Sequence, residues 1–494
     1  MISPRYEERV GIGLNYILEN LHGCSPFGQE RIRRLRFYAP EERAALEEEL
    51  CNTERAAASV SSEKELIDRI MLELCRFKDV RASLKRCREG ETLDHVELFE
   101  LKGYLERIET LIPLFAAWNG TAKQSDVALH DPQPALDVLD PMHTRSRGFY
   151  IPDGASEALR AVRREKKALE ERLKNAQTDA ERTEIRLLRT RVCADEETEE
   201  RKVRESMCRA LAPMTDDLLA DAETVGTLDF RIQKALFAVR YACVRPEITD
   251  SELELCDMVN PEIADLLAEK GRRFVPVSIA LDRGATVITG ANMGGKSVTL
   301  KTLALEVLLC HAGFLVPAGA ARIPLFCCIR MLFDDLQSIR SGLSGFGSEI
   351  VQFGQALRET EQGYSLLLLD EFARGTNPDE GAVIVKAVTQ YLNGVNAISV
   401  LSTHYDRVAE AASRHYQIIG LKDADPAAIA REIGASVEDG VAAIARHMNY
   451  GLYRVEGRAD CPKDALNICR MLSLKPEILA LIEASHAGAD PKIS

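Results

Sequence analysis

The stretch that decides the fold is Gly290-Ala291-Asn292-Met293-Gly294-Gly295-Lys296-Ser297, which fits the pattern G-x-x-x-x-G-K-S. A β-rich apolar run, Ala285 to Thr289, precedes it, and a helix-compatible run, Val298 to Leu303, follows it. A strand, a glycine-rich turn and a helix are the context that a phosphate-binding loop requires. In such a loop the backbone N–H groups turn toward phosphates, Lys296 would reach the β- and γ-phosphates, and Ser297 would ligate Mg²⁺. The flanking strand and helix argue against the alternative, a chance glycine-rich turn.

Two more apolar runs with turn signals at their ends follow this loop, Leu366 to Leu369 and Ala397 to Leu401. Continuous runs of this length suit strands that are buried on both faces of a parallel sheet. Because these runs alternate with helical stretches after Pro246, the sequence predicts an α/β domain from about residue 250 onward.

Polar side chains follow both of these strands directly. Asp370 would hold the Mg²⁺ shell, and Glu371 would position and polarise the attacking water, unless the pair only caps the next helix. His404, after the other strand, could sense the γ-phosphate or the attacking water, although a lone histidine is more often structural. Because α/β sheets bind ligands at the carboxyl ends of their strands, these residues are candidates for one site.

Residues 1 to about 245 are rich in Glu, Arg, Leu and Ala and are predicted to be mostly helical. A heptad-like stripe, with Lys166 in its gap, predicts a long helix packed against a partner; its apolar members are Leu159, Val162, Leu169 and Leu173. The charged run from Glu196 to Lys202 is interpreted as a solvated face or helix tip in preference to a binding patch. The segment 131–154 is expected to be irregular.

Composition sets broad limits on function. The 494 residues include 63 Lys plus Arg and 77 Asp plus Glu, a formal net charge of −14, which repels phosphate backbones unless a local basic surface overrides it. The 13 cysteines form no C-x-x-C pair, so zinc ribbons and disulfide scaffolds are disfavoured and reduced cytosolic thiols are favoured. With no signal peptide or transmembrane helix expected, we predict a cytoplasmic protein without a membrane partner.

With these residues in place, the chain resembles the MutS family of ATPases. The stretch Thr289 to Ser297 is similar to the family's T-G-x-N-M-G-G-K-S/T, and Asp370 to Thr376 is similar to its D-E-x-x-R-G-T. Ser402 to Tyr405 resembles the T-H-Y/F switch, and Val316-Pro317-Ala318 resembles the family's V-P-A. These motifs cover about residues 285–410.

The resemblance implies an ABC-type ATPase that uses ATP and Mg²⁺ and works as a dimer, either with itself or with a MutS-like paralogue. Catalysis would rest on Glu371, Lys296 and His404, and the metal would be held by Ser297 and Asp370. A serine from one subunit would complete the other's site; Ser344 matches it, with a partnerless flexible loop as the alternative. Asn292 would also contact the γ-phosphate. The expected nucleotide-binding set is Gly290, Ala291, Asn292, Met293, Gly294, Gly295, Lys296, Ser297, Val298 and Ser344.

The fold class that follows is multidomain, a mainly α-helical lever and clamp-like region before an α/β ABC-type phosphate-loop ATPase domain. The expected parts are a helical core or lever at 1–150, a long-helix clamp-like insertion with the return to the lever at 151–245, the ATPase at 246–460, and a helix-turn-helix dimerisation element at 461–494. An Ala-rich, helical insertion is expected at 422–446.

Three functions stay open. The first is a DNA-linked ATPase whose levers clamp duplex or branched DNA without reading mismatches, because the family's Phe-x-Glu wedge motif does not occur in the sequence. The second is a protein-remodelling ATPase that helps to reactivate a client enzyme, an adenosylcobalamin-dependent amino-acid mutase. The third is a factor that splits collided ribosomes, which the lack of an Smr nuclease domain disfavours. Four arginines could touch a DNA backbone, although a solvated helix face is the favoured interpretation: Arg182, Arg186, Arg189 and Arg191.

Overall fold

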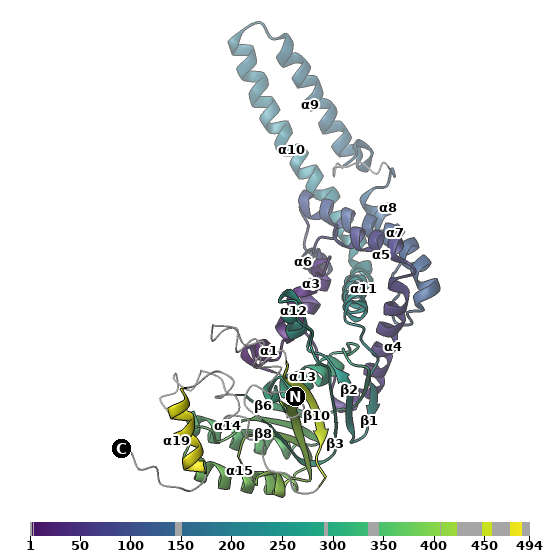
Figure 1. Cartoon of the computed structure of the whole chain (residues 1–494). Helices are drawn as coiled ribbons and strands as arrows, with labels where there is room; N and C mark the ends of the chain where they lie inside the picture. The colour runs from purple at the N-terminus through teal and green to yellow at the C-terminus, as the bar shows by residue number, and fades with distance from the viewer. Residues whose placement is uncertain are drawn as a thin grey trace. The chain divides into compact units, whose positions relative to one another are not determined.

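The computed structural model describes residues 2, 4–143, 151–290, 295–333, 345–405, 407–421, 447–456 and 475–486. The chain divides into two compact units (Figure 1). The α/β unit comprises Met1–Leu21, Arg36–Glu54 and Leu236–Ser494, and the helical unit comprises His22–Leu35 and Arg55–Ala235. Within the described ranges, no helix has the length and apolar character needed to cross a membrane.

Helices build the whole of the described helical unit, as the composition predicts. Two of them, α4 and α11, each span a boundary between the units. The helices are α3 Pro26–Arg33, α4 Arg43–Val60, α5 Lys64–Leu74, α6 Arg81–Arg88, α7 His95–Ala122, α8 Gln133–Leu139, α9 Glu157–Asn175, α10 Asp179–Leu211 and α11 Thr215–Arg240. Because α8 lies inside the segment 131–154, the expectation of wholly irregular structure there is wrong.

The helices α9 and α10 pack side by side as a long antiparallel hairpin (Figure 1). The predicted apolar stripe forms its seam. Leu159 packs with Val203 and Met207 of α10, and Leu169 packs with Ile185 and Val192. The stripe therefore stabilises the hairpin by removing apolar surface from water, as predicted.

The charged run is only partly a solvated face. It lies in the middle of α10, where Glu196 and Glu200 are mostly buried. Both accept from Arg163 of α9: Glu196 lies 3.2 Å from its Nε and Glu200 lies 2.7 Å from its Nη2. Lys166, the residue in the gap of the stripe, also pairs with Glu196. Arg201 at the end of the run remains exposed. The inward carboxylates thus face cations across the seam, which sets the register of the two helices.

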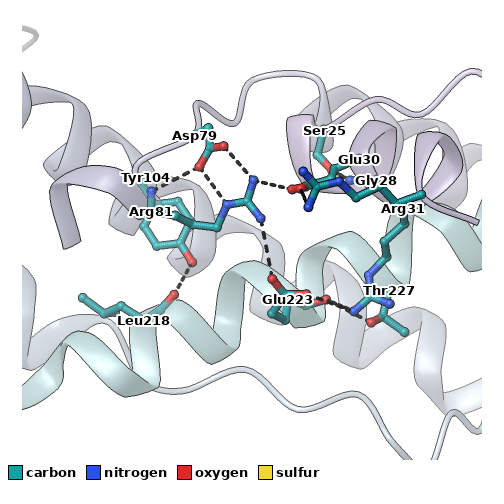
Figure 2. Close-up of polar contacts among 11 residues, drawn as sticks. Ser25, Gly28, Glu30, Arg31, Asp79, Arg81, Tyr104, Leu218, Glu223 and Thr227 are labelled. Carbon is teal, nitrogen blue, oxygen red and sulfur yellow. Dashed lines mark hydrogen bonds and ion pairs between the residues drawn. The ribbon is translucent and has the colours of Figure 1, made fainter. Parts of the chain in front are cut away.

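A second polar network lies around Arg81, at the start of α6 (Figure 2). Its guanidinium binds both carboxylate oxygens of Asp79, at 2.9 and 2.7 Å, and lies 2.6 Å from Glu30 on α3. Glu223 on α11 lies 3.6 Å from it and also pairs with Arg31. One arginine therefore joins α3, the residues before α6, and α11.

The α/β unit is built on a six-stranded sheet with the order β10-β9-β4-β8-β7-β6. Pairing is parallel from β9 to β6, and β10 is antiparallel. The strands are β4 Gly284–Thr289, β6 Cys328–Leu332, β7 Ser365–Asp370, β8 Ala397–Thr403, β9 Arg414–Gly420 and β10 Asn449–Arg454. Every residue of β4, β7 and β8 is buried, so the three predicted strands and their burial on both faces are confirmed.

Helices and a second sheet complete this unit. The helices include α1 Tyr6–Gly11, α2 Leu14–Asn20, α12 Pro261–Glu269, α13 Lys296–His311, α14 Gly345–Thr360, α15 Pro378–Leu392 and α19 Pro476–His486. A mixed sheet of order β1-β5-β2-β3 was not predicted; it contains β1 Glu247–Thr249, β2 Leu253–Met258, β3 Val277–Leu281 and β5 Ala320–Pro324. The Ala-rich segment 422–446 and most of the predicted helix-turn-helix lie outside the described residues.

Candidate nucleotide site

The candidate residues meet at one edge of the six-stranded sheet. In β8, which lies between β4 and β7, Thr403 pairs with Thr289, the last residue of β4, and Ser402 pairs with Asp370, the last residue of β7. Asp370 therefore lies at the carboxyl end of its strand, and the phosphate-loop sequence, Glu371 and His404 directly follow the carboxyl ends of adjacent parallel strands. This is the position at which α/β sheets bind ligands.

The turn between β4 and α13 has a backbone that requires glycine. Gly295, which precedes α13, has φ of +93°, and a Cβ atom there would lie 3.1 Å from Cδ1 of Tyr450. A Cβ at Gly290 would lie 3.0 Å from that of Ile418. This turn leads into the N-terminus of a 16-residue helix, and the backbone N–H groups and dipole of a helix N-terminus attract anions. Ala291, Asn292, Met293 and Gly294 lie outside the described residues.

Lys296 is 4% exposed, although it carries a charge. Its Nζ donates to the carbonyl oxygen of Gly290 at 2.8 Å and lies 3.9 Å from Oε1 of Glu371. Folding thus brings together the lysine and the carboxylate that the sequence analysis selected separately. Ser297 and Val298 follow in the first turn of α13 and are half-buried.

Ser402 organises the two carboxylate residues. Its hydroxyl donates to Oδ1 of Asp370 and accepts the Glu371 N–H at 3.0 Å. Glu371 has φ of +48°, a left-handed conformation that costs a non-glycine residue free energy and is common at functional sites. Oε2 of Glu371 accepts from Arg374 at 2.9 Å. The helix that follows is capped by Asn377, so the alternative that Asp370 and Glu371 are only its cap is wrong.

His404 is exposed directly after β8, and its ring centroid lies 4.6 Å from that of Tyr405. The Tyr405 hydroxyl donates to the carbonyl oxygen of Ala373 at 3.0 Å, beyond the end of β7. Burial, together with the carboxylates of Glu349 and Glu371, raises the pKa of Tyr405. The tyrosine therefore stays a neutral donor and ties the residues after β7 to those after β8. Ser344 lies outside the described residues, just before α14.

A buried polar group at the end of β4 was not predicted from the sequence. Thr289 is buried at the end of β4, and its hydroxyl lies 2.7 Å from Nε2 of His415 on β9 and 3.4 Å from Nε2 of Gln417. Burial lowers the pKa of His415, which favours a neutral ring. Tyr453 of β10 donates to Gln417 and extends the group. The available signal in the sequence was the alternation of two polar residues, His415 and Gln417, along β9. Only the pairing of β9 with β4 shows that both lie beside Thr289.

At this sheet edge a helix N-terminus that attracts anions lies next to a buried lysine and carboxylates. These features are typical of α/β domains of the nucleotide-binding class. Residues 286–473 match the family described as MutS domain V. The chain therefore contains a MutS domain V in this part, which makes up 188 of its 494 residues.

Several curated proteins are similar to this chain over the same part. Endonuclease MutS2 of Acetivibrio thermocellus is 31% identical over 223 residues, which cover 43% of this chain and 26% of that protein. DNA mismatch repair protein MutS of Haloquadratum walsbyi is 35% identical over 197 residues, which cover 40% of this chain and 21% of that protein. Endonuclease MutS2 of Ligilactobacillus salivarius is 34% identical over 212 residues, which cover 42% of this chain and 26% of that protein. The match thus spans about a quarter of the length of these relatives.

Proposed function

We propose that this chain is a Mg²⁺-dependent ATPase that closes as a dimer around two ATP molecules and acts on DNA. The observation that carries the proposal is the position of Lys296, buried between the Gly290 carbonyl and the Glu371 carboxylate. A buried ammonium at the mouth of a helix N-terminus is suited to bind the terminal phosphates of a nucleotide.

The residues at this edge fit ATP and Mg²⁺. Glycine is required at positions 290 and 295, because a Cβ atom at either would press against a neighbouring side chain. Ser297 and Asp370 would hold Mg²⁺, which prefers oxygen ligands and retains several waters. When bound, the ion would neutralise charge that develops on the phosphate oxygens.

The chemistry of this chain's own residues then follows from position and charge. Lys296 would stabilise negative charge on the terminal phosphate. Glu371 would orient and polarise the attacking water, and His404 would contact that water or the γ-phosphate. The network through Ser402 and Tyr405 would keep these groups in register.

DNA is proposed as the partner because one similar protein is named a DNA mismatch repair protein and others are named endonucleases. We propose that Ser344 of a second copy completes each site. The part 461–494 would contribute to the dimer, while 1–150 and 151–245 would supply the lever and a clamp-like hairpin driven by the ATPase part, 246–460.

The test is stimulation of ATP hydrolysis by the full-length chain with duplex DNA, branched DNA, ribosomes or an inactivated adenosylcobalamin-dependent mutase. We expect DNA to stimulate hydrolysis and the effect to fall steeply as salt rises, because phosphate contacts release counterions. Stimulation only by the mutase would replace DNA with a protein client. A hydrolysis rate in Lys296→Ala equal to that of the wild type would refute the site itself.

A further inference from the structure

We propose that His95, Glu197 and Glu200 form a binding site for a first-row divalent transition metal in the helical unit. His95 is the first residue of α7, whereas the two glutamates lie three positions apart on α10 and so share one helix face. One ligand atom from each of the three side chains lies within 4.8 Å of the others. His95 Nε2 and Glu200 Oε2 are 3.3 Å apart.

The position of His95 is fixed by backbone contacts on its N-terminal side. The N–H of Leu93 donates to Sγ of Cys208 at 3.3 Å, and its carbonyl oxygen accepts from Arg204 at 3.4 Å, both on α10. The Asp94 side chain then caps α7. The histidine is therefore held beside α10 by contacts other than its own side chain, which lowers the entropy cost of binding an ion.

Each carboxylate is oriented by an arginine that leaves one oxygen for a ligand bond. Arg204 binds Oε1 of Glu197 at 2.8 Å, and Arg163 binds Oε1 of Glu200 at 2.7 Å. Metal-ligating carboxylates commonly have such hydrogen-bonded outer partners.

The donor set decides the class of ion. One imidazole nitrogen and two carboxylate oxygens suit Zn²⁺, Co²⁺ or Mn²⁺, whereas Mg²⁺ and Ca²⁺ prefer oxygen ligands alone. A bound ion would join the start of α7 to α10 in the stretch next to Val203, which packs against Leu159 of α9. It would thus cross-link α7 and α10 at one end of the α9–α10 hairpin, within the helical unit.

The experiment uses Co²⁺ as the probe, with the full-length, reduced, nucleotide-free chain after dialysis against a chelator. Visible absorption should report one tight equivalent of Co²⁺ with nitrogen and oxygen ligands. His95→Gln should lower Co²⁺ affinity by more than the factor of about 10–100 that is typical for losing an outer-shell partner. Glu197→Gln should also weaken binding; its side chain is 67% exposed, and the glutamine keeps an oxygen that can accept from Arg204, so we expect the fold to be retained.

The matched control is His143→Gln, an exposed histidine 3.8 Å from Asp137. It should leave Co²⁺ binding unchanged. Equal binding by the wild type, His95→Gln and Glu197→Gln would overturn the proposal. So would thiolate-to-cobalt charge-transfer absorption as the signal of the tight equivalent, because it would place the ion on some of the 13 cysteines.

Discussion

Mild acid should weaken the α/β unit through one buried histidine, His311, at the end of α13. Its Nδ1 donates to the carbonyl oxygen of Tyr38 at 2.9 Å, and its Nε2 accepts the N–H of Phe326 at 3.2 Å. The bond from Phe326 requires the neutral ring, since a protonated Nε2 has no lone pair to accept it, whereas Nδ1 donates to Tyr38 in either protonation state. Burial is the main reason that the pKa of His311 falls from 6.5 to about 4.

The sign and size of the effect follow from linkage. Because the pKa is lower in the folded state, the unfolded chain binds more protons between pH 6.5 and 4. The stabilisation is therefore complete above pH 6.5 and is lost as the pH falls toward 4. Each tenfold difference in proton affinity is worth about 1.4 kcal/mol, so the total is about 3 kcal/mol, of which about 2 kcal/mol is lost by pH 5.

The assay is a denaturant series equilibrated at pH 7.5 and at pH 5, followed by a hydrogen-exchange pulse at one common pH and mass spectrometry of peptides from α13 and the Phe326 region. The wild type should lose about 2 kcal/mol more between the two pH values than His311→Gln does. Fluorescence of Trp118, the only tryptophan, reports on the helical unit and serves as the internal control. Equal losses in wild type and variant would refute the reasoning.

Three further predictions concern the site and the helical unit. Lys296→Ala should abolish nucleotide binding in equilibrium dialysis, whereas Glu371→Ala should keep ATP bound in a dimer seen by size exclusion and slow hydrolysis by about 10²–10⁴-fold. Gly295→Ala should cost about 1–2 kcal/mol of stability, because its φ is +93°, and should weaken ATP binding in the same dialysis assay. Arg81→Ala should lower the free energy of unfolding of the helical unit by about 2 kcal/mol in urea titrations followed by Trp118 fluorescence, with Arg81→Lys restoring only part of it.

The central sheet could be predicted because its strands are uniformly apolar. All six residues of β7 are buried, so their sequence, Ser365 followed by four leucines and Asp370, carries the signal alone. The mixed sheet carries no such signal. Its β1 has three residues, with one exposed, and pairs with β5, which is more than seventy residues away in the sequence. Short strands of this kind are specified by long-range pairing, which no local pattern records.

The sequence predicted which residues form the site, but it could not predict the contacts that they make with one another. The motifs select Lys296, Asp370 and Glu371, and strand order alone predicts that they share an edge. The bond from Ser402 to Asp370 depends on the register of β7 and β8, and the distance from Lys296 to Glu371 depends on the rotamers of both. His415 was missed because it lies on a strand with no recognised motif.

The contact between Lys296 and Glu371 explains two effects that we expect of Glu371→Ala, namely tighter ATP binding and slower hydrolysis. A γ-phosphate that enters the turn would compete with Glu371 for the ammonium, since both are anions and only one buried cation lies between them among the described residues of this edge. Removing the carboxylate therefore takes away a competitor for Lys296 and a repulsive charge beside the phosphate, and it also removes the group proposed to polarise water. Tighter ATP binding and slower hydrolysis then have one electrostatic cause. A neutral isostere, Glu371→Gln, separates this cause from lost packing, because it keeps the shape of the side chain and changes only its charge.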